Sequence, residues 1–222
     1  MLKANLDYEN RTAKLENEKE LENWRENVLY KIVPKNARPD CPAIPFCDLD
    51  IIFYLPIETE RCVNAKLIIS NDTAEFLGAT ADTLYSHAKE NAPKKHKAKA
   101  FSLATDAMMK GIKESTVEDP DITATIKAIT GTDPIVITTT DNTDGFCAVN
   151  YPEVKQALEE KYGEFYILPS SVHEALVMPK SVGEAGDLLQ MVTTINKAGV
   201  APADFLADNV YICKNSIITS YV

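Results

Sequence analysis

The sequence predicts a mixed α/β (α+β) fold in which a largely antiparallel sheet is covered by helices. Two observations predict it: segments with helical periodicity alternate with short β-branched runs, and several neighbouring runs are close enough to form hairpins. The 222 residues are 45% hydrophobic and 25% charged, as is usual for a globular chain. A chain of this length can bury a core of its own, so we expect one globular domain. If the chain forms two lobes, the acidic segment 114–121 is the expected boundary.

In the N-terminal half, one long helix is expected to precede strands and shorter helices. Apolar residues recur at helical spacing and predict a helix over about 13–32: Leu21, Trp24, Val28, Leu29 and Ile32. Prolines then interrupt regular structure before the alternating run 49–55, a predicted strand that Pro56 closes. A second strand is expected at 65–70 and a helical turn at 71–78. Thr80 is expected to cap a helix that ends before Pro93.

The middle and the C-terminal part alternate between helical and extended patterns. The basic segment 94–99 is expected to turn into a helix that carries Leu103, Ala107 and Met108, while 122–129 fits a strand or a helix equally well. The elements expected after it are strands at 135–139, 146–149 and 165–168, helices at 152–162 and 182–197, and a final hairpin that pairs 210–213 with 216–222 across Lys214 and Asn215.

The charge of the chain argues against nucleic acid as a partner. Its formal net charge is -10, whereas nucleic-acid binding requires Lys and Arg to neutralise phosphates. The charge is unevenly distributed along the sequence. The segment from Leu84 to Lys113 contains seven lysines and two carboxylates, whereas the segment from Glu114 to Glu164 contains eleven carboxylates and three lysines. The acidic stretch fits a solvated surface that could pair with the lysines.

Composition also indicates a cytoplasmic protein. No apolar run approaches the length of a membrane span, and the first twenty residues are charged where a secretory signal would be apolar. The five cysteines, at 41, 47, 62, 147 and 213, are an odd and scattered set, which is typical of reduced thiols. We therefore expect no membrane association and a location in the cytosol.

The segment LPSSVHE at 168–174 is the densest polar cluster in the sequence. Ser170, Ser171, His173 and Glu174 are the residue types of a nucleophile, a base and an orienting acid. On an extended segment Ser171 and His173 share a face, but their side chains run parallel from Cα atoms about 6.6 Å apart, which disfavours a catalytic hydrogen bond. On a helical segment Ser171 and Glu174 form a capping box, which is the preferred interpretation. A catalytic role would need a partner from a distant part of the chain.

Other motifs give weaker indications of chemistry. Cys147 could act as a nucleophile with His173, but its apolar surroundings favour a small buried side chain. Cys41 and Cys47 are too far apart for a zinc hairpin, and the turn at 140–145 lacks the bidentate Glu of a calcium loop and is expected to join two strands. Because no glycine-rich phosphate loop is present either, we expect no metal and no cofactor.

Several segments together resemble a bacterial family of domains of unknown function, number 5688, which is found chiefly in anaerobic Gram-positive bacteria. The segments that carry the resemblance are ISNDTAEFLG with Leu84, Ala88 and Asn91, then FYILPSSVHEALVMP, then Met191, Val192 and Asn196, and finally DNVYIC. The resemblance covers about two thirds of the chain and is most specific at LPSSVHE. It implies a cytoplasmic bacterial protein and singles out Ser170, Ser171, His173 and Glu174, but it supplies no mechanism.

Three functions remain open on the sequence alone. The first is a non-catalytic binding or regulatory protein that associates with a protein partner or with itself, because no catalytic or cofactor set is complete. The second is a small hydrolase in which His173 is the base, Glu174 orients it, and Ser171 or Cys147 is the nucleophile. The third is an acidic decoy that inhibits a nucleic-acid-binding protein.

Overall fold

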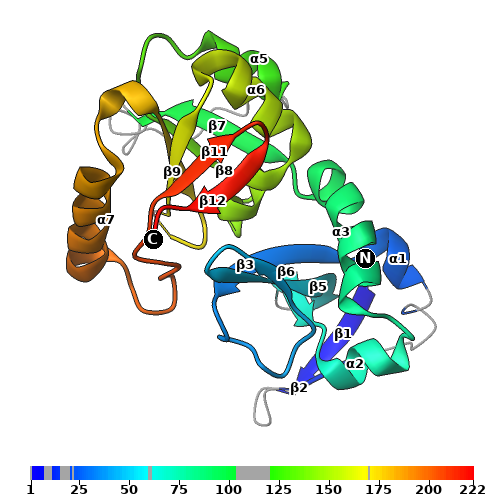
Figure 1. Ribbon diagram of the computed structural model, residues 1–222. Coiled ribbons are helices and arrows are strands. Elements are labelled where there is room, and N and C mark those ends of the chain that lie inside the picture. The colour runs from blue at the N-terminus through cyan, green and yellow to red at the C-terminus, as the bar shows by residue number, and fades with distance from the viewer. Residues whose placement is uncertain are drawn as a thin grey trace. The chain divides into compact units, whose positions relative to one another are not determined.

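The computed structural model describes residues 2–7, 12–15, 21, 23–59, 62–103, 121–169 and 171–222. The chain forms two compact units, Met1–Lys95 and His96–Val222, and each contains a six-stranded sheet (Figure 1). Among the described strands, every pair is antiparallel except β1 with β5. The predicted mixed α+β fold with largely antiparallel pairing is confirmed, with two sheets. The boundary expected at 114–121 lies almost wholly outside the described residues and stays a prediction.

The first unit is organised around β5, an eleven-residue strand that pairs with four others. Its strands are β1 (Leu2–Asp7), β2 (Thr12–Leu15), β3 (Leu29–Pro34), β4 (Ile44–Phe46), β5 (Leu49–Thr59) and β6 (Cys62–Ile68). Its helices are α1 (Trp24–Asn27), α2 (Asn71–Phe76) and α3 (Ala81–Lys95), of which α3 packs against β3 and α1. The predicted cap at Thr80 is confirmed, because its Oγ1 accepts the Thr83 N–H at 3.2 Å. The helix nevertheless continues two residues beyond Pro93.

The long helix predicted over 13–32 is wrong. Its described residues contain the end of β2, the one-turn helix α1 and most of β3, so Leu29 and Ile32 lie in a strand. In β3, four of the six residues are buried and they occur on both faces of the strand. A strand buried on both faces has a nearly continuous apolar run, which also matches helical spacing.

The strand predicted at 49–55 does not end at Pro56, because β5 continues to Thr59. Proline lacks an N–H and is tolerated in a strand only where no ladder bond is lost. The pairing of β5 with β3 reaches Tyr54, and its pairing with β1 begins at Ile57. Pro56 therefore lies in the interval between these two partners, and only β6 continues alongside it.

The second unit has the strand order β12-β11-β9-β10-β8-β7. Its elements are β7 (Ala98–Ser102), α5 (Ile122–Ala128), β8 (Ile135–Thr139), the 3-10 helix η2 (Gly145–Asn150), α6 (Pro152–Tyr162), β9 (Phe165–Pro169), β10 (Ala175–Pro179), the 3-10 helix η3 (Lys180–Val182), α7 (Ala185–Gly199), β11 (Tyr211–Lys214) and β12 (Ile217–Ser220). The predicted helix α6 and strands β8 and β9 are confirmed. The final hairpin is confirmed too, although its turn residues are Asn215 and Ser216, which both have positive φ.

Both faces of this second sheet are covered, by α7 on one side and by α6 with η2 on the other (Figure 1). Tyr166 and Leu168 of β9 pack with Leu188 and Val192 of α7. The alternate residues of β9 point to the opposite face. On that face the ring of Phe146 from η2 lies 5.7 Å from the ring of Tyr211. Strands β8 and β9 are consequently buried along their whole length.

Three expectations for the second unit are settled by the structure. The basic segment 94–99 leads first into the strand β7, which was not expected, and Leu103 directly after it is helical as predicted, while Ala107 and Met108 lie outside the described residues. The ambiguous segment 122–129 is helical, with Asp121 as its N-cap. The strand predicted at 146–149 is wrong, because this apolar run forms η2, in which five of the six residues are buried. A short apolar run does not distinguish a strand from a buried helical turn.

Two asparagines from the segments that carry the family resemblance connect neighbouring elements. The Asn91 amide on α3 donates to the carbonyl oxygens of Arg25 at 2.9 Å and Val28 at 3.0 Å, which joins α3 to the start of β3. The Asn196 amide on α7 donates to the Ala207 carbonyl at 3.0 Å and to the Asp208 carboxylate at 2.9 Å. Both side chains therefore hold backbone in place.

Replacement of Asn91 by Ala should lower the free energy of unfolding by about 1 to 3 kcal/mol, because two carbonyl oxygens lose their donors. Urea denaturation followed by circular dichroism measures the change. Glu90→Ala, at an exposed neighbouring position on the same helix, is the matched control and should change stability by less than about 0.5 kcal/mol. Equal losses in the two variants would contradict the assigned role of Asn91.

Candidate functional site

The polar residues predicted from the sequence lie where three loops of the second unit meet. These loops are 139–145 after β8, 171–174 between β9 and β10, and 200–209 after α7, and we call them the three-loop cluster. The end of β8 and the start of β10 share one sheet end, because Ala175 pairs with Ile137. Backbone bonds join the loops: the Gly145 N–H donates to the His173 carbonyl and the Val172 N–H to the Asp204 carbonyl, both at 2.9 Å.

His173 is the central side chain of the three-loop cluster. Its Nδ1 accepts the backbone N–H of Asp144 at 3.4 Å, and its Nε2 lies 3.3 Å from Asp204 Oδ1. Because an N–H faces Nδ1, the proton of the neutral ring belongs on Nε2, from which it is donated to Asp204. Both ring nitrogens are thus engaged, although the side chains of His173 and Asp204 are 42% and 44% exposed.

Ser171 and Glu174 close the turn that leads from β9 into β10. The Ser171 Oγ accepts the His173 N–H at 3.0 Å, and the Ser171 N–H donates to the Glu174 carbonyl at 3.3 Å. The predicted capping box is wrong, since no helix begins here and Ala175 is the first residue of β10. A strand is favoured because β10 pairs with both β8 and β9. Ser170 lies outside the described residues.

The structure does not bring the predicted nucleophiles to the imidazole. Among the described residues, the His173 ring bonds to Asp144 and Asp204, while the Ser171 Oγ accepts the backbone N–H of His173. Cys147 is 1% exposed within η2, which confirms the expected buried thiol but not the expected strand. The carboxylate beside His173 is Asp204, and not the sequence neighbour Glu174.

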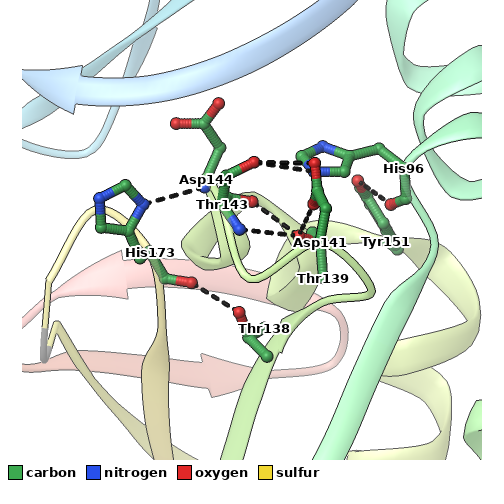
Figure 2. Close-up of polar contacts among 8 residues, drawn as sticks. All are labelled: His96, Thr138, Thr139, Asp141, Thr143, Asp144, Tyr151 and His173. Carbon is green, nitrogen blue, oxygen red and sulfur yellow. Dashed lines mark hydrogen bonds and ion pairs between the residues drawn. The ribbon is translucent and has the colours of Figure 1, made fainter. Parts of the chain in front are cut away.

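A second histidine, His96, was not expected from the sequence and lies in a partly buried network (Figure 2). Its Nε2 is 2.6 Å from Asp141 Oδ1, and His96 is only 6% exposed. The same carboxylate accepts the Thr139 hydroxyl at 2.7 Å and the Thr143 hydroxyl at 3.0 Å. Asp141 is 45 residues from His96 in sequence, so no local motif could have indicated the pair.

The network keeps Asp141 ionised. Burial raises the pKa of this carboxyl, but the hydrogen bonds from His96, Thr139 and Thr143 outweigh burial, and the pKa lies well below its ordinary value. In a catalytic relay the acid and the nucleophile bind opposite nitrogens of the imidazole. Here Asp141 and the Thr143 hydroxyl both approach Nε2 of His96, the hydroxyl at 3.4 Å. The arrangement is therefore suited to holding the loop.

The loop at 139–145 differs from the expected hairpin turn. It joins β8 to the 3-10 helix η2, and Asn142 and Asp144 adopt positive φ within it. Thr139 Oγ1 also lies 2.7 Å from the Thr143 carbonyl, which closes the loop on itself. Within the described residues, no group of three or more His, Cys, Asp or Glu side chains could hold a metal ion.

Gly145 allows the loop to approach the turn at His173. A Cβ on this residue would lie 2.0 Å from the His173 carbonyl oxygen and 2.5 Å from Thr138 Cα. Both are backbone atoms, so no side-chain rotation relieves the overlap. The same carbonyl also accepts the Thr138 hydroxyl at 2.8 Å. Only glycine permits this contact between two backbone segments.

Gly145→Ala is expected to lower the free energy of unfolding by about 3 kcal/mol or more, because the two backbone segments must separate. Thermal melts and hydrogen exchange at the 139–145 amides measure the effect. Gly131→Ala is not an adequate control because Gly131 has φ +66, whereas Gly199→Ala, where a Cβ meets nothing within 4 Å, is suitable. A Gly145 variant as stable as the Gly199 variant would disprove the close contact.

Asp141→Asn is expected to reduce stability at pH 7 by about 1 to 3 kcal/mol, because hydrogen bonds to a charged acceptor are lost. The folded pKa of Asp141 is depressed, so its contribution is complete above the unfolded pKa, near 4, and disappears as the pH falls towards the folded pKa. Unfolding between pH 7 and pH 2.5 should therefore show a smaller difference between wild type and variant at low pH. Asp133→Asn, at an exposed position, serves as the control. A difference that is constant with pH would rule out the depressed pKa.

Comparison with known sequences agrees with the resemblance found in the motifs. Among the described residues, no helix is both long and apolar enough to cross a membrane. No curated protein and no solved structure matches the chain. The sequence model of a family of unknown function, DUF5688, matches residues 3–214. Because that match spans nearly all of the 222 residues, the chain belongs to the DUF5688 family.

Proposed function

We propose that this protein is a non-catalytic binding or regulatory protein that contacts its partner through the three-loop cluster. The observation that carries the proposal is the state of His173, whose two ring nitrogens are already engaged by the Asp144 N–H and by Asp204. A general base needs a nitrogen lone pair directed at the substrate. In this arrangement the ring serves as part of the loop scaffold.

The geometry of the cluster suits a contact surface. Its loops are joined by two backbone bonds of 2.9 Å and therefore present side chains in a defined arrangement. Loops held by a rigid scaffold frequently carry binding residues, and a preorganised surface loses less entropy on binding. His173 and Asp204 remain partly exposed and are the side chains that a partner would meet. We propose a protein partner or a second copy of this chain, since a net charge of -10 disfavours nucleic acid.

The cytoplasm is the proposed location. Cys41 and Cys213 are buried thiols outside any disulfide, which accords with a reducing compartment. Burial raises the pKa of Cys213 to about 11, so this thiol remains protonated and unreactive.

A hydrolase is the second candidate, favoured by the 3.3 Å contact of His173 with Asp204. In that mechanism Asp204 would orient the imidazole, in place of Glu174, and Nδ1 would leave the Asp144 N–H to accept a proton from the nucleophile. The backbone N–H contact is long, at 3.4 Å, and its loss would cost about 1 kcal/mol. Among the described residues, this candidate lacks a nucleophile that is hydrogen-bonded to the ring.

Association of the purified chain and of native lysate, by size exclusion with light scattering and by affinity capture, tests the proposal. We expect self-association or a retained protein partner. Asp204→Lys, which reverses a charge on the cluster, should weaken that association at least about tenfold, corresponding to 1.4 kcal/mol. Lys197→Glu, an exposed reversal on α7, should leave it unchanged.

The other outcomes separate the alternatives. If neither a partner nor self-association is found, or if both variants behave alike, the proposed contact surface is wrong. Ester or phosphoester hydrolysis that disappears in His173→Gln would favour the hydrolase. Binding to basic proteins that weakens steeply with salt, and equally in both variants, would favour the acidic decoy.

A further inference from the structure

The last hairpin of the second unit, β11 with β12, closes through a strained turn (Figure 1). Its two turn residues, Asn215 and Ser216, have positive φ of 49° and 59°. Two-residue turns between twisted strands need such angles at both positions, and the favoured sequence is Asn-Gly. Asn enters this region of backbone conformation more readily than most residues, whereas Ser does so rarely. The closed hairpin therefore carries strain at position 216.

Helix α6 holds this turn in place. The Glu159 carboxylate accepts the Ser216 backbone N–H at Oε1 and the Ser216 hydroxyl at Oε2, the latter at 2.7 Å. The Lys155 Nζ donates to the Ser216 carbonyl oxygen at 3.4 Å and to Asn150 Oδ1 at 3.1 Å. Lys155 and Glu159 are four residues apart and lie on one face of the helix. These two side chains, which we call the α6 latch, supply the surroundings that a strained residue needs in order to persist.

Beyond the turn, β12 is a lightly attached edge strand. It ends the strand order of its sheet and, among the described strands, pairs with β11 alone. None of its four side chains is buried, and Ile217 is 65% exposed. The attachment of β12 therefore depends on backbone pairing with β11, which an identical strand from another molecule can reproduce.

The residues before β11 extend this backbone pairing past the end of β12. The Tyr221 N–H donates to the Val210 carbonyl oxygen at 2.8 Å. The Asn209 carboxamide donates to the Val222 carbonyl oxygen at 3.2 Å and accepts the Val222 N–H at 3.4 Å. Asn209 is only 4% exposed, so its carboxamide is fixed in the unit and acts as one more residue of the ladder. Residues 209–214 thus form a receptor for an extended strand, which we call the strand receptor.

We propose that β12 is an exchangeable strand: when the α6 latch opens, β12 leaves its own strand receptor and occupies that of a second copy, which returns its own β12. The exchange reproduces between molecules the contacts that the receptor makes in the closed chain. Only the turn differs, because residues 215 and 216 become extended when the hairpin opens. The latch favours the closed form, and the strain at Ser216 favours the exchanged form. This inference goes beyond the proposed function and does not rest on it, because it requires neither His173 nor Asp204.

Glu159→Gln should shift the chain towards a dimer, because it weakens contacts that exist only in the closed form. Size exclusion with light scattering, on the full chain over a range of concentrations, measures the association constant. We expect this constant to rise at least about tenfold over that of the wild type. Glu160→Gln is the matched control, because Glu160 is the next residue of α6 and pairs with Lys127. This control should leave the association constant unchanged.

Ser216→Gly should act in the opposite direction. Glycine adopts positive φ without strain and keeps the backbone N–H that Glu159 accepts. Added to Glu159→Gln, it should return the association constant to near the wild-type value. Ser216→Ala keeps the strain and removes only the hydroxyl bond, so it should raise the constant. It provides a second variant should Glu159→Gln fail to fold.

An engineered disulfide distinguishes strand exchange from other kinds of dimer. Ile212 and Thr219 face each other in the register of β11 and β12. Facing residues of an antiparallel pair are close enough for a disulfide, so Ile212→Cys with Thr219→Cys reports which strands are paired. Cys47 and Cys62 are replaced by Ser to prevent other links. After oxidation, the closed chain is linked within one molecule, whereas the exchanged dimer is linked between two and runs as a dimer on a non-reducing gel.

Each result decides the inference. If Glu159→Gln and Ser216→Ala associate no more strongly than Glu160→Gln, the α6 latch does not control exchange. Dimers whose disulfides lie within single molecules would show that β12 is not the exchanged strand. If Ser216→Gly fails to reverse Glu159→Gln, strain does not drive the opening. Asp204→Lys should leave the exchange unchanged, so this inference and the proposed function can fail separately. Circular dichroism and thermal melts establish that each variant is folded.

Discussion

The candidate site depends on one backbone carbonyl, that of His173. It accepts the Gly145 N–H at 2.9 Å and the Thr138 hydroxyl at 2.8 Å, and so attaches the β9–β10 turn to the end of β8 and the loop that follows. Two backbone segments approach this closely only because position 145 has no Cβ. Once the carbonyl is fixed, the imidazole of the same residue is directed to the Asp144 N–H and to Asp204. The orientation of the ring is thus a consequence of backbone packing.

The two histidines of the second unit serve different purposes because their burial differs. His96 is 6% exposed, and a buried polar group is costly unless it is paired. Asp141 supplies that pairing and itself accepts the hydroxyls of Thr139 and Thr143. His173 is partly exposed and retains access to solvent. Of the two, only His173 is placed to meet another molecule.

The elements that could be predicted from the sequence are those in which local pattern and tertiary environment agree. Helix α6 has an apolar stripe, a proline at its start and a glycine after its end, and β9 has an apolar run of strand length. The segments 13–32 and 146–149 were mispredicted because their apolar residues are buried on several sides, so that spacing no longer indicates one periodicity. The partners of the two histidines lie 31 and 45 residues away, and only the fold brings them together. Sequence alone could therefore indicate His173, but neither His96 nor Asp204.

In the segments that carry the family resemblance, the described polar residues stabilise turns and join neighbouring elements of the fold. These roles explain the residues without a catalytic interpretation. Ser171 closes the β9–β10 turn, and the amides of Asn91 and Asn196 hold backbone of neighbouring elements. Of the two candidate nucleophiles that the structure describes, the Ser171 Oγ accepts a backbone N–H and the Cys147 thiol is enclosed in η2. Both groups thus serve the local structure of the loops around His173.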